Sequence, residues 1–147
     1  MKSGFLIGFF LLSLLSSCEK YKDSSRFALL STNQRLSKDW KLVSQSENAH
    51  ASDLTGFDVH LIVLPNQTYS FSTNYTHFGE VIKTEKRGKW QFVSSSKTLF
   101  LSELGGTKVE RFTVLVLKKG EMQLQQNSPS SHAVKSITTK LYQFKSK

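Results

Sequence analysis

The chain has 147 residues, a formal net charge of +9 and a single cysteine. One cysteine excludes an internal disulfide, and the lysines and arginines form no single run, so no nucleic-acid partner is predicted. Two roles for the positive charge stay open: attraction of acidic partners such as anionic lipid headgroups, and solubility alone.

An export signal is predicted at the N-terminus. Lys2 is the only charge before position 19, and Gly4 to Leu15 is uncharged and mostly apolar. A positive start followed by an apolar stretch is typical of a signal peptide, and this stretch is shorter than the about 20 residues that span a bilayer. Leu15-Ser16-Ser17-Cys18 closes it and resembles the bacterial lipobox, in which the cysteine is acylated and the leader is removed. The alternative is an ordinary secretory signal with a chance cysteine.

The lipobox, the polar residues that follow it and the length of the remaining chain together predict three parts of the chain. Residues 1–17 are the lipoprotein signal peptide, residues 18–35 are the lipidated Cys18 with a flexible tether, and residues 36–147 are one folded domain. Removing the first 17 of 147 residues removes Lys2, which leaves 130 residues and a charge of +8. Several acyl chains, palmitate among them, hold a protein firmly on a membrane where one chain holds weakly. The expected location is the bacterial cell envelope, at the outer membrane.

A short helical turn is expected within residues 27–36, and a series of short strands follows it. Apolar or alternating runs separated by turn residues are typical of an all-β sandwich or barrel. The eight runs are Trp40–Ser46, Phe57–Leu64, Thr68–Thr73, Gly88–Val93, Thr98–Ser102, Lys108–Leu117, Glu121–Gln126 and Lys135–Phe144. Glu47–Thr55 is predicted as a polar loop, and residues 78–84 stay open as an extra strand or an extension of a neighbour.

The connections between these runs indicate how the strands pair. Most are short turns such as Pro65-Asn66-Gln67 and Gly105-Gly106, which favour antiparallel pairing of consecutive strands. Closing the sheet removes its two exposed edges. We therefore predict an all-β fold: an eight-stranded antiparallel up-and-down barrel with a short N-terminal helical turn. Its interior is either filled by side chains or holds one small ligand.

Short motifs occur along the chain in a recognisable order. They are Leu36, Trp40-Lys41-Leu42-Val43, Phe57, Pro65-Asn66-Gln67-Thr68-Tyr69, Gly88-Lys89-Trp90 and Leu99-Phe100-Leu101. This order resembles the small lipocalin-like lipoproteins of Bacteroidetes over roughly residues 36–144. The resemblance implies a lipid-anchored, lipocalin-like barrel. Lys38 and Gln67 depart from it, since the family usually has glycine at both positions.

The sequence contains no pattern for catalysis or metal binding. The four histidines lie far apart without metal-ligand spacing, and each is interpreted as facing solvent: His50, His60, His77 and His132. No serine lies in a Gly-x-Ser-x-Gly elbow, and no glycine-rich loop precedes a helix. We therefore expect a protein that is not an enzyme and that uses no metal and no cofactor.

An apolar interior is the feature that bears most on function. Large apolar side chains on one face of the strands suit a small hydrophobic ligand. The candidate ligand-binding residues are Tyr69, Phe71, Trp90, Phe92, Leu101 and Phe112. Two hypotheses follow. The protein is a monomeric carrier of a small apolar ligand, or it is a filled barrel that binds another envelope protein, for example as an inhibitor.

Overall fold

A computed structural model describes residues 30–129 and 137–147, and Ser31–Lys147 forms one compact unit. The predicted signal peptide, the lipobox and Cys18 lie outside the described residues, as does His132. Within the described ranges, no helix has the length and apolar character needed to cross a bilayer.

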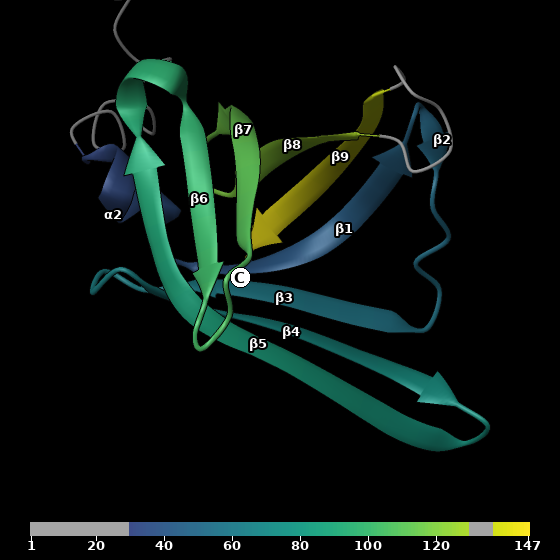
Figure 1. The fold of residues 1–147 in the computed structure, drawn as a ribbon. Coiled ribbons are helices and arrows are strands. Elements are labelled where there is room, and N and C mark those ends of the chain that lie inside the picture. The colour runs from purple at the N-terminus through teal and green to yellow at the C-terminus, as the bar shows by residue number, and fades with distance from the viewer. Residues whose placement is uncertain (1–29, 130–136) are drawn as a thin grey trace, which may run out of the picture. The chain divides into compact units, whose positions relative to one another are not determined.

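The described residues contain one α-helix, one short 3₁₀ turn and a nine-stranded sheet (Figure 1). The elements are α2 (Thr32–Leu36), β1 (Asp39–Glu47), β2 (His50–Ala51), β3 (Phe57–Val63), β4 (Thr68–His77), β5 (Glu80–Val93), η2 (Ser94–Ser96), β6 (Thr98–Glu103), β7 (Val109–Leu117), β8 (Glu121–Pro129) and β9 (Ile137–Ser146). Each of the eight predicted runs corresponds to one strand, and β2 is a two-residue addition within the predicted polar loop.

The sheet closes into an eight-stranded antiparallel up-and-down barrel, which confirms the predicted fold class. From β3 onward each strand pairs with the next in sequence, and β9 returns to β1 with Trp40 opposite Ser146 and Glu47 opposite Lys140. β1 pairs with β3 only over Asp39–Lys41, and its far end pairs with β2 instead. The barrel wall is therefore continuous at the start of β1, whereas β1 and β3 separate toward the end of β1.

Residues 78–84 belong mainly to an extension of β5 and form no separate strand. β4 and β5 pair out to His77 opposite Glu80, and the hairpin projects beyond the neighbouring strands (Figure 1). Phe78 and Gly79 make the turn with φ values of 48° and 83°. Two residues with positive φ form the tight turn that suits twisted hairpins, usually with Asn or Asp before the glycine. Phe78 occupies the position where Asn or Asp is usual, so the sequence does not indicate a turn here.

The core is built on two tryptophans whose ring nitrogens are both satisfied. The Trp40 indole N–H donates to the Leu36 carbonyl oxygen at 2.8 Å, which fastens the end of α2 to the start of β1. The Trp90 indole N–H donates to the Leu64 carbonyl oxygen at 2.8 Å. A buried indole needs such a partner, because an unpaired N–H in an apolar core is costly. The largest fully buried side chains around them include Leu61, Leu99, Met122 and Leu124.

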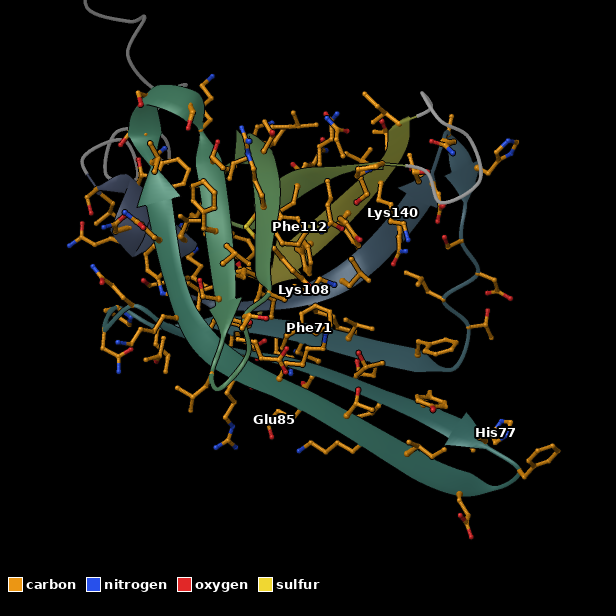
Figure 2. The ribbon with its side chains drawn as sticks, in the orientation of Figure 1. Phe71, His77, Glu85, Lys108, Phe112 and Lys140 are labelled. Atoms are coloured by element: carbon orange, nitrogen blue, oxygen red, sulfur yellow. The ribbon has the colours of Figure 1, made fainter. Side chains whose placement is uncertain are left out.

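Alternation along the strands separates the inside of the barrel from the outside. Phe71 and Phe112 point into the barrel from β4 and β7, whereas Glu85 points away from it (Figure 2). Residues i and i+2 of a strand share a face, so inward and outward positions alternate. On β3, Phe57, Val59, Leu61 and Val63 share one face; the last three are buried, whereas Phe57 at the start of the strand is 48% exposed.

Candidate ligand-binding cavity

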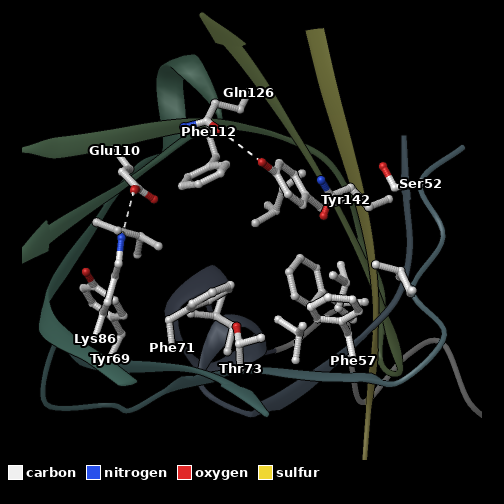
Figure 3. Close-up of a pocket in the computed structure, with 18 of the residues that line it drawn as sticks. Ser52, Phe57, Tyr69, Phe71, Thr73, Lys86, Glu110, Phe112, Gln126 and Tyr142 are labelled. Carbon is white, nitrogen blue, oxygen red and sulfur yellow. Dashed lines mark hydrogen bonds and ion pairs between the residues drawn. The ribbon is translucent and has the colours of Figure 1, made fainter. Parts of the chain in front are cut away.

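The barrel interior contains a cavity of about 470 Å³ (Figure 3). Small-molecule sites span about 300–1,000 Å³, so the volume is that of a site for one small ligand. Much of its wall is aliphatic or aromatic and comes from several strands around the barrel, including Leu42, Val59, Leu61, Leu124 and Phe144. The interior is therefore not completely filled by side chains.

The structure brings four of the six candidate ligand-binding residues into this wall: Tyr69, Phe71, Leu101 and Phe112. Trp90 and Phe92 share the inward face of β5 but do not line the cavity: Trp90 is buried in the core, and Phe92 packs against it. Alternation predicts which face of the sheet a residue takes, but not whether the residue borders the space that stays open inside the barrel. The binding role of these residues stays a prediction.

Gly88 makes room for the Tyr69 ring in this wall. The two residues are opposite each other in the β4–β5 pair. A Cβ atom at position 88 would overlap the Ser102 carbonyl oxygen and lie 2.8 Å from Tyr69 Cε1. Burial, followed by the charges of Glu110 and Glu103, raises the pKa of the Tyr69 phenol, so the hydroxyl is neutral at physiological pH. This hydroxyl makes no hydrogen bond to any other described residue.

Two polar pairs interrupt the apolar wall (Figure 3). Lys86 Nζ on β5 lies 4.0 Å from Glu110 Oε1 on β7. The Tyr142 hydroxyl on β9 donates to Gln126 Oε1 on β8 at 3.2 Å. Burial is the main cause that raises the pKa of Tyr142, so this residue also stays neutral. The cavity thus offers an apolar volume with a few polar groups at defined places, the usual character of a small-molecule site.

Residues 52–54 supply a part of the wall that the sequence pattern does not predict. They lie where β1 and β3 part, and the Ser52 N–H donates to the Gln45 carbonyl oxygen at 2.8 Å. All three residues line the cavity. The segment belongs to the loop that the sequence predicts to be polar. Leu54 is the one apolar residue among residues 52–54, and it is the only feature of their sequence that indicates a position in the cavity wall.

A second polar cluster lies on the outer face, between β1 and β3. His60 Nδ1 is 2.8 Å from Asp39 Oδ1, and His60 Nε2 is 3.3 Å from Asp58 Oδ1. Lys41 Nζ lies 2.7 Å from the same Asp58 oxygen, and this contact is the main cause that holds the pKa of Asp58 below its usual value.

The prediction that His60 faces solvent is therefore wrong. His60 points outward from β3 as predicted, but only 8% of it is exposed because its neighbours on β1 and β3 cover it. The cluster links these strands where their pairing is short. Among residues 30–129 and 137–147, no group of three or more histidine, cysteine or acidic residues is arranged to hold a metal ion.

Comparison with known proteins identifies the architecture. No protein-family model and no curated protein sequence matches the chain. Among solved structures, the bovine lipocalin allergen Bos d 2 is similar with a TM-score of 0.51 and 7% identity, over 78% of this chain and 75% of that one. The odorant-binding protein from bovine nasal mucosa aligns over 80% of this chain and 75% of that one, with a TM-score of 0.49 and 11% identity. Likeness at such low identity shows the fold alone: the barrel has lipocalins among its structural neighbours.

Proposed function

We propose that the protein binds one small hydrophobic ligand inside its barrel and acts as a carrier and not as a catalyst. The observation that carries the proposal is the cavity of about 470 Å³ with its largely apolar wall. The interior of an eight-stranded barrel is either filled by side chains or holds one small ligand, and the open cavity supports the second case. Apolar surface that a ligand covers contributes about 25 cal/mol per Å², which makes such a wall a favourable place for an apolar molecule.

Native mass spectrometry of the full-length protein, purified from its own cells in mild detergent, tests this proposal. We expect a fraction of the protein to carry one additional small molecule, which organic extraction releases. The extracted protein should then take up an apolar naphthalene dye with one-to-one stoichiometry. If the protein carries nothing and binds no dye after extraction, the carrier function is excluded.

We also propose that Cys18 is lipidated and that the protein works in the bacterial envelope, as a lipoprotein of the Bacteroidetes type. The support is the sequence Leu15-Ser16-Ser17-Cys18 behind a short apolar stretch, together with the order of motifs over roughly residues 36–144. A firm membrane anchor would keep a carrier near lipids and other apolar molecules, which are the ligands that its cavity suits.

Binding of a protein partner is a second candidate function, and the β4–β5 hairpin favours it. Phe78 at the tip is 95% exposed and Val81 is 75% exposed. The Arg87 carbonyl oxygen accepts from the Leu104 N–H at 2.8 Å, so the backbone of Arg87 faces β6. The backbone N–H and C=O groups of successive residues in a strand point to opposite sides, so those of Val81, Lys83 and Glu85 point to the same side as those of Arg87. No described strand pairs with β5 on that side at these three residues. An extended segment of a partner can add to such an edge.

Photo-crosslinking in living cells tests the second candidate. A photoreactive side chain at Phe78 should form a discrete adduct with a protein partner, whereas the same group at the exposed Leu104 serves as a control on the barrel. Equal, diffuse labelling from both positions would exclude the hairpin as a specific binding surface.

A further inference from the structure

The polar groups of the cavity wall identify the chemistry of the ligand's head. We propose that the ligand is an amphiphile with a carboxylate head, which binds Lys86 and Tyr69 while its apolar body occupies the interior; this rests on the proposed ligand-binding function.

Lys86 is the one basic residue among the described residues that line the cavity, and its partner holds it loosely. Its Nζ lies 4.0 Å from Glu110 Oε1, which is beyond hydrogen-bonding distance. About half of the Lys86 side chain is exposed, at 51%, so the ammonium can turn toward a ligand. Lys108 Nζ lies 3.7 Å from the same Glu110 oxygen. A ligand carboxylate can therefore bind the Lys86 ammonium while Glu110 keeps its ion pair with Lys108.

Tyr69 supplies a second donor on the same side of the cavity. Residues 86 and 88 share a face of β5, and Tyr69 is opposite Gly88, which places the phenol beside Lys86 (Figure 3). Tyr69 lines the cavity, and its hydroxyl is neutral and has no hydrogen-bond partner among the described residues. An ammonium and a hydroxyl that face one space can each donate to one of the two oxygens of a carboxylate. Both hydrogen bonds would be charge-assisted, which makes them stronger than hydrogen bonds between neutral groups.

The acidic residues of the wall do not offer an equal site to a cationic head. Glu110 already has two ammonium groups within 4.0 Å, from Lys86 and Lys108. Asp53 accepts the Thr55 N–H at 2.8 Å and belongs to the segment between β1 and β3. The formal charge of the chain, +9, also attracts anions to the protein from a distance. An anionic head group can therefore bind Lys86, whereas a cationic head group would compete with Lys86 and Lys108 for Glu110.

Binding of decanoate, decanol and decylamine to the delipidated full-length protein tests the head-group assignment. The three probes share one apolar body, so they differ in the head alone. We expect decanoate to bind roughly tenfold more tightly than decanol, which is the effect of one charge-assisted hydrogen bond, and decylamine to bind most weakly.

Variants of the two donors locate the effect. Lys86→Gln should weaken decanoate binding roughly tenfold and leave decanol binding unchanged, and Tyr69→Phe should weaken decanoate binding by a smaller factor. Glu110→Gln should tighten decanoate binding because it removes the competing carboxylate. Lys83→Gln is the matched control: it makes the same charge change on the outward face of β5, and decanoate should bind it as it binds the unmodified protein.

The two proposals fail in different ways. If decanol binds as tightly as decanoate, or if Lys86→Gln and Lys83→Gln weaken decanoate equally, the carboxylate site is refuted and the apolar cavity function stands. If none of the three probes binds the unmodified protein, the carrier function itself is refuted.

Discussion

The Tyr69 ring lies across Gly88, its partner in the β4–β5 pair, in space that a Cβ atom at position 88 would invade. Glycine is thus required where a strand passes unusually close to the Ser102 carbonyl on β6. Tyr69 itself lines the cavity. The absence of a side chain at position 88 therefore affects both the packing of β5 against β6 and the space available to a residue of the cavity wall.

Gly88→Ala should destabilise the protein and weaken ligand binding together. Its Cβ would overlap backbone and contact Tyr69, and overpacking of this kind costs about 1–3 kcal/mol. Chemical denaturation measures the loss of unfolding free energy. Gly106→Ala is the control, because the nearest atom to its Cβ would lie at 3.4 Å. Equal stability of the two variants would contradict this account of Gly88.

Trp90→Ala should lower the free energy of unfolding by about 3–5 kcal/mol, as is typical of a buried aromatic residue. The indole is buried, and its loss removes the 2.8 Å hydrogen bond to the Leu64 carbonyl oxygen, which then accepts only the Gln67 N–H at 3.2 Å among the described residues. Trp90→Phe should cost less, since it keeps most of the volume. A loss below about 1 kcal/mol on urea denaturation of Trp90→Ala would place this residue outside the core.

Alternation of side chains predicts much of this fold from sequence. The eight runs between Trp40 and Phe144, their antiparallel order and the closure of the barrel follow from period-two patterns and turn residues. The same pattern places Phe71 and Phe112 inside. Closure follows because an open sheet of eight strands leaves two unpaired edges.

The remaining features depend on contacts between segments that are distant in sequence. His60 points outward but is covered by residues of two strands, and the period of one strand does not show this. Trp90 takes the predicted face but does not line the cavity, whereas Leu101, its partner on β6, does. The turn at Phe78 is formed without the usual turn residues, because the pairing of two long strands imposes it.

The pKa of Glu85 offers a test of the outer face of the β4–β5 hairpin. Hydrogen bonds from Arg87 and Ser70 lower it from an ordinary value of 4.5 to about 2. A lowered pKa means that folding favours the ionised carboxylate. The resulting stability is present above pH 4.5 and is lost as the pH falls toward 2.

NMR titration of the Glu85 side chain measures this pKa directly. Arg87→Gln should raise it toward the ordinary value, because the Arg87 Nε contact at 2.8 Å disappears. Lys89→Gln serves as the control, since it removes a cation two residues further along the same face of β5 and Lys89 is not among the groups that shift Glu85. A carboxyl that titrates near 4.5 in the unmodified protein would contradict the hydrogen-bonded arrangement.

Cys18→Ala should abolish lipid attachment. The variant should accumulate either as a precursor with its leader uncleaved or as protein released from the membrane, because the proposed acyl chains supply the anchor. Cell fractionation with carbonate washing, followed by N-terminal sequencing, distinguishes these products. A processed Cys18→Ala protein that remains in the washed membranes would refute the lipid anchor, and Ser17→Ala, which keeps a small residue before the cysteine, should behave as the unmodified protein.

Titration of an apolar naphthalene dye into the unmodified protein and two tryptophan variants tests the carrier function most directly. Leu101 lines the cavity, whereas Leu104, three residues later, is 77% exposed. We predict that the unmodified protein and Leu104→Trp saturate at about one dye per chain, and that Leu101→Trp binds none while it still unfolds cooperatively, because the larger ring takes the ligand's space. Absence of saturable binding to the unmodified protein, or equal binding by folded Leu101→Trp, would contradict a ligand site inside the barrel.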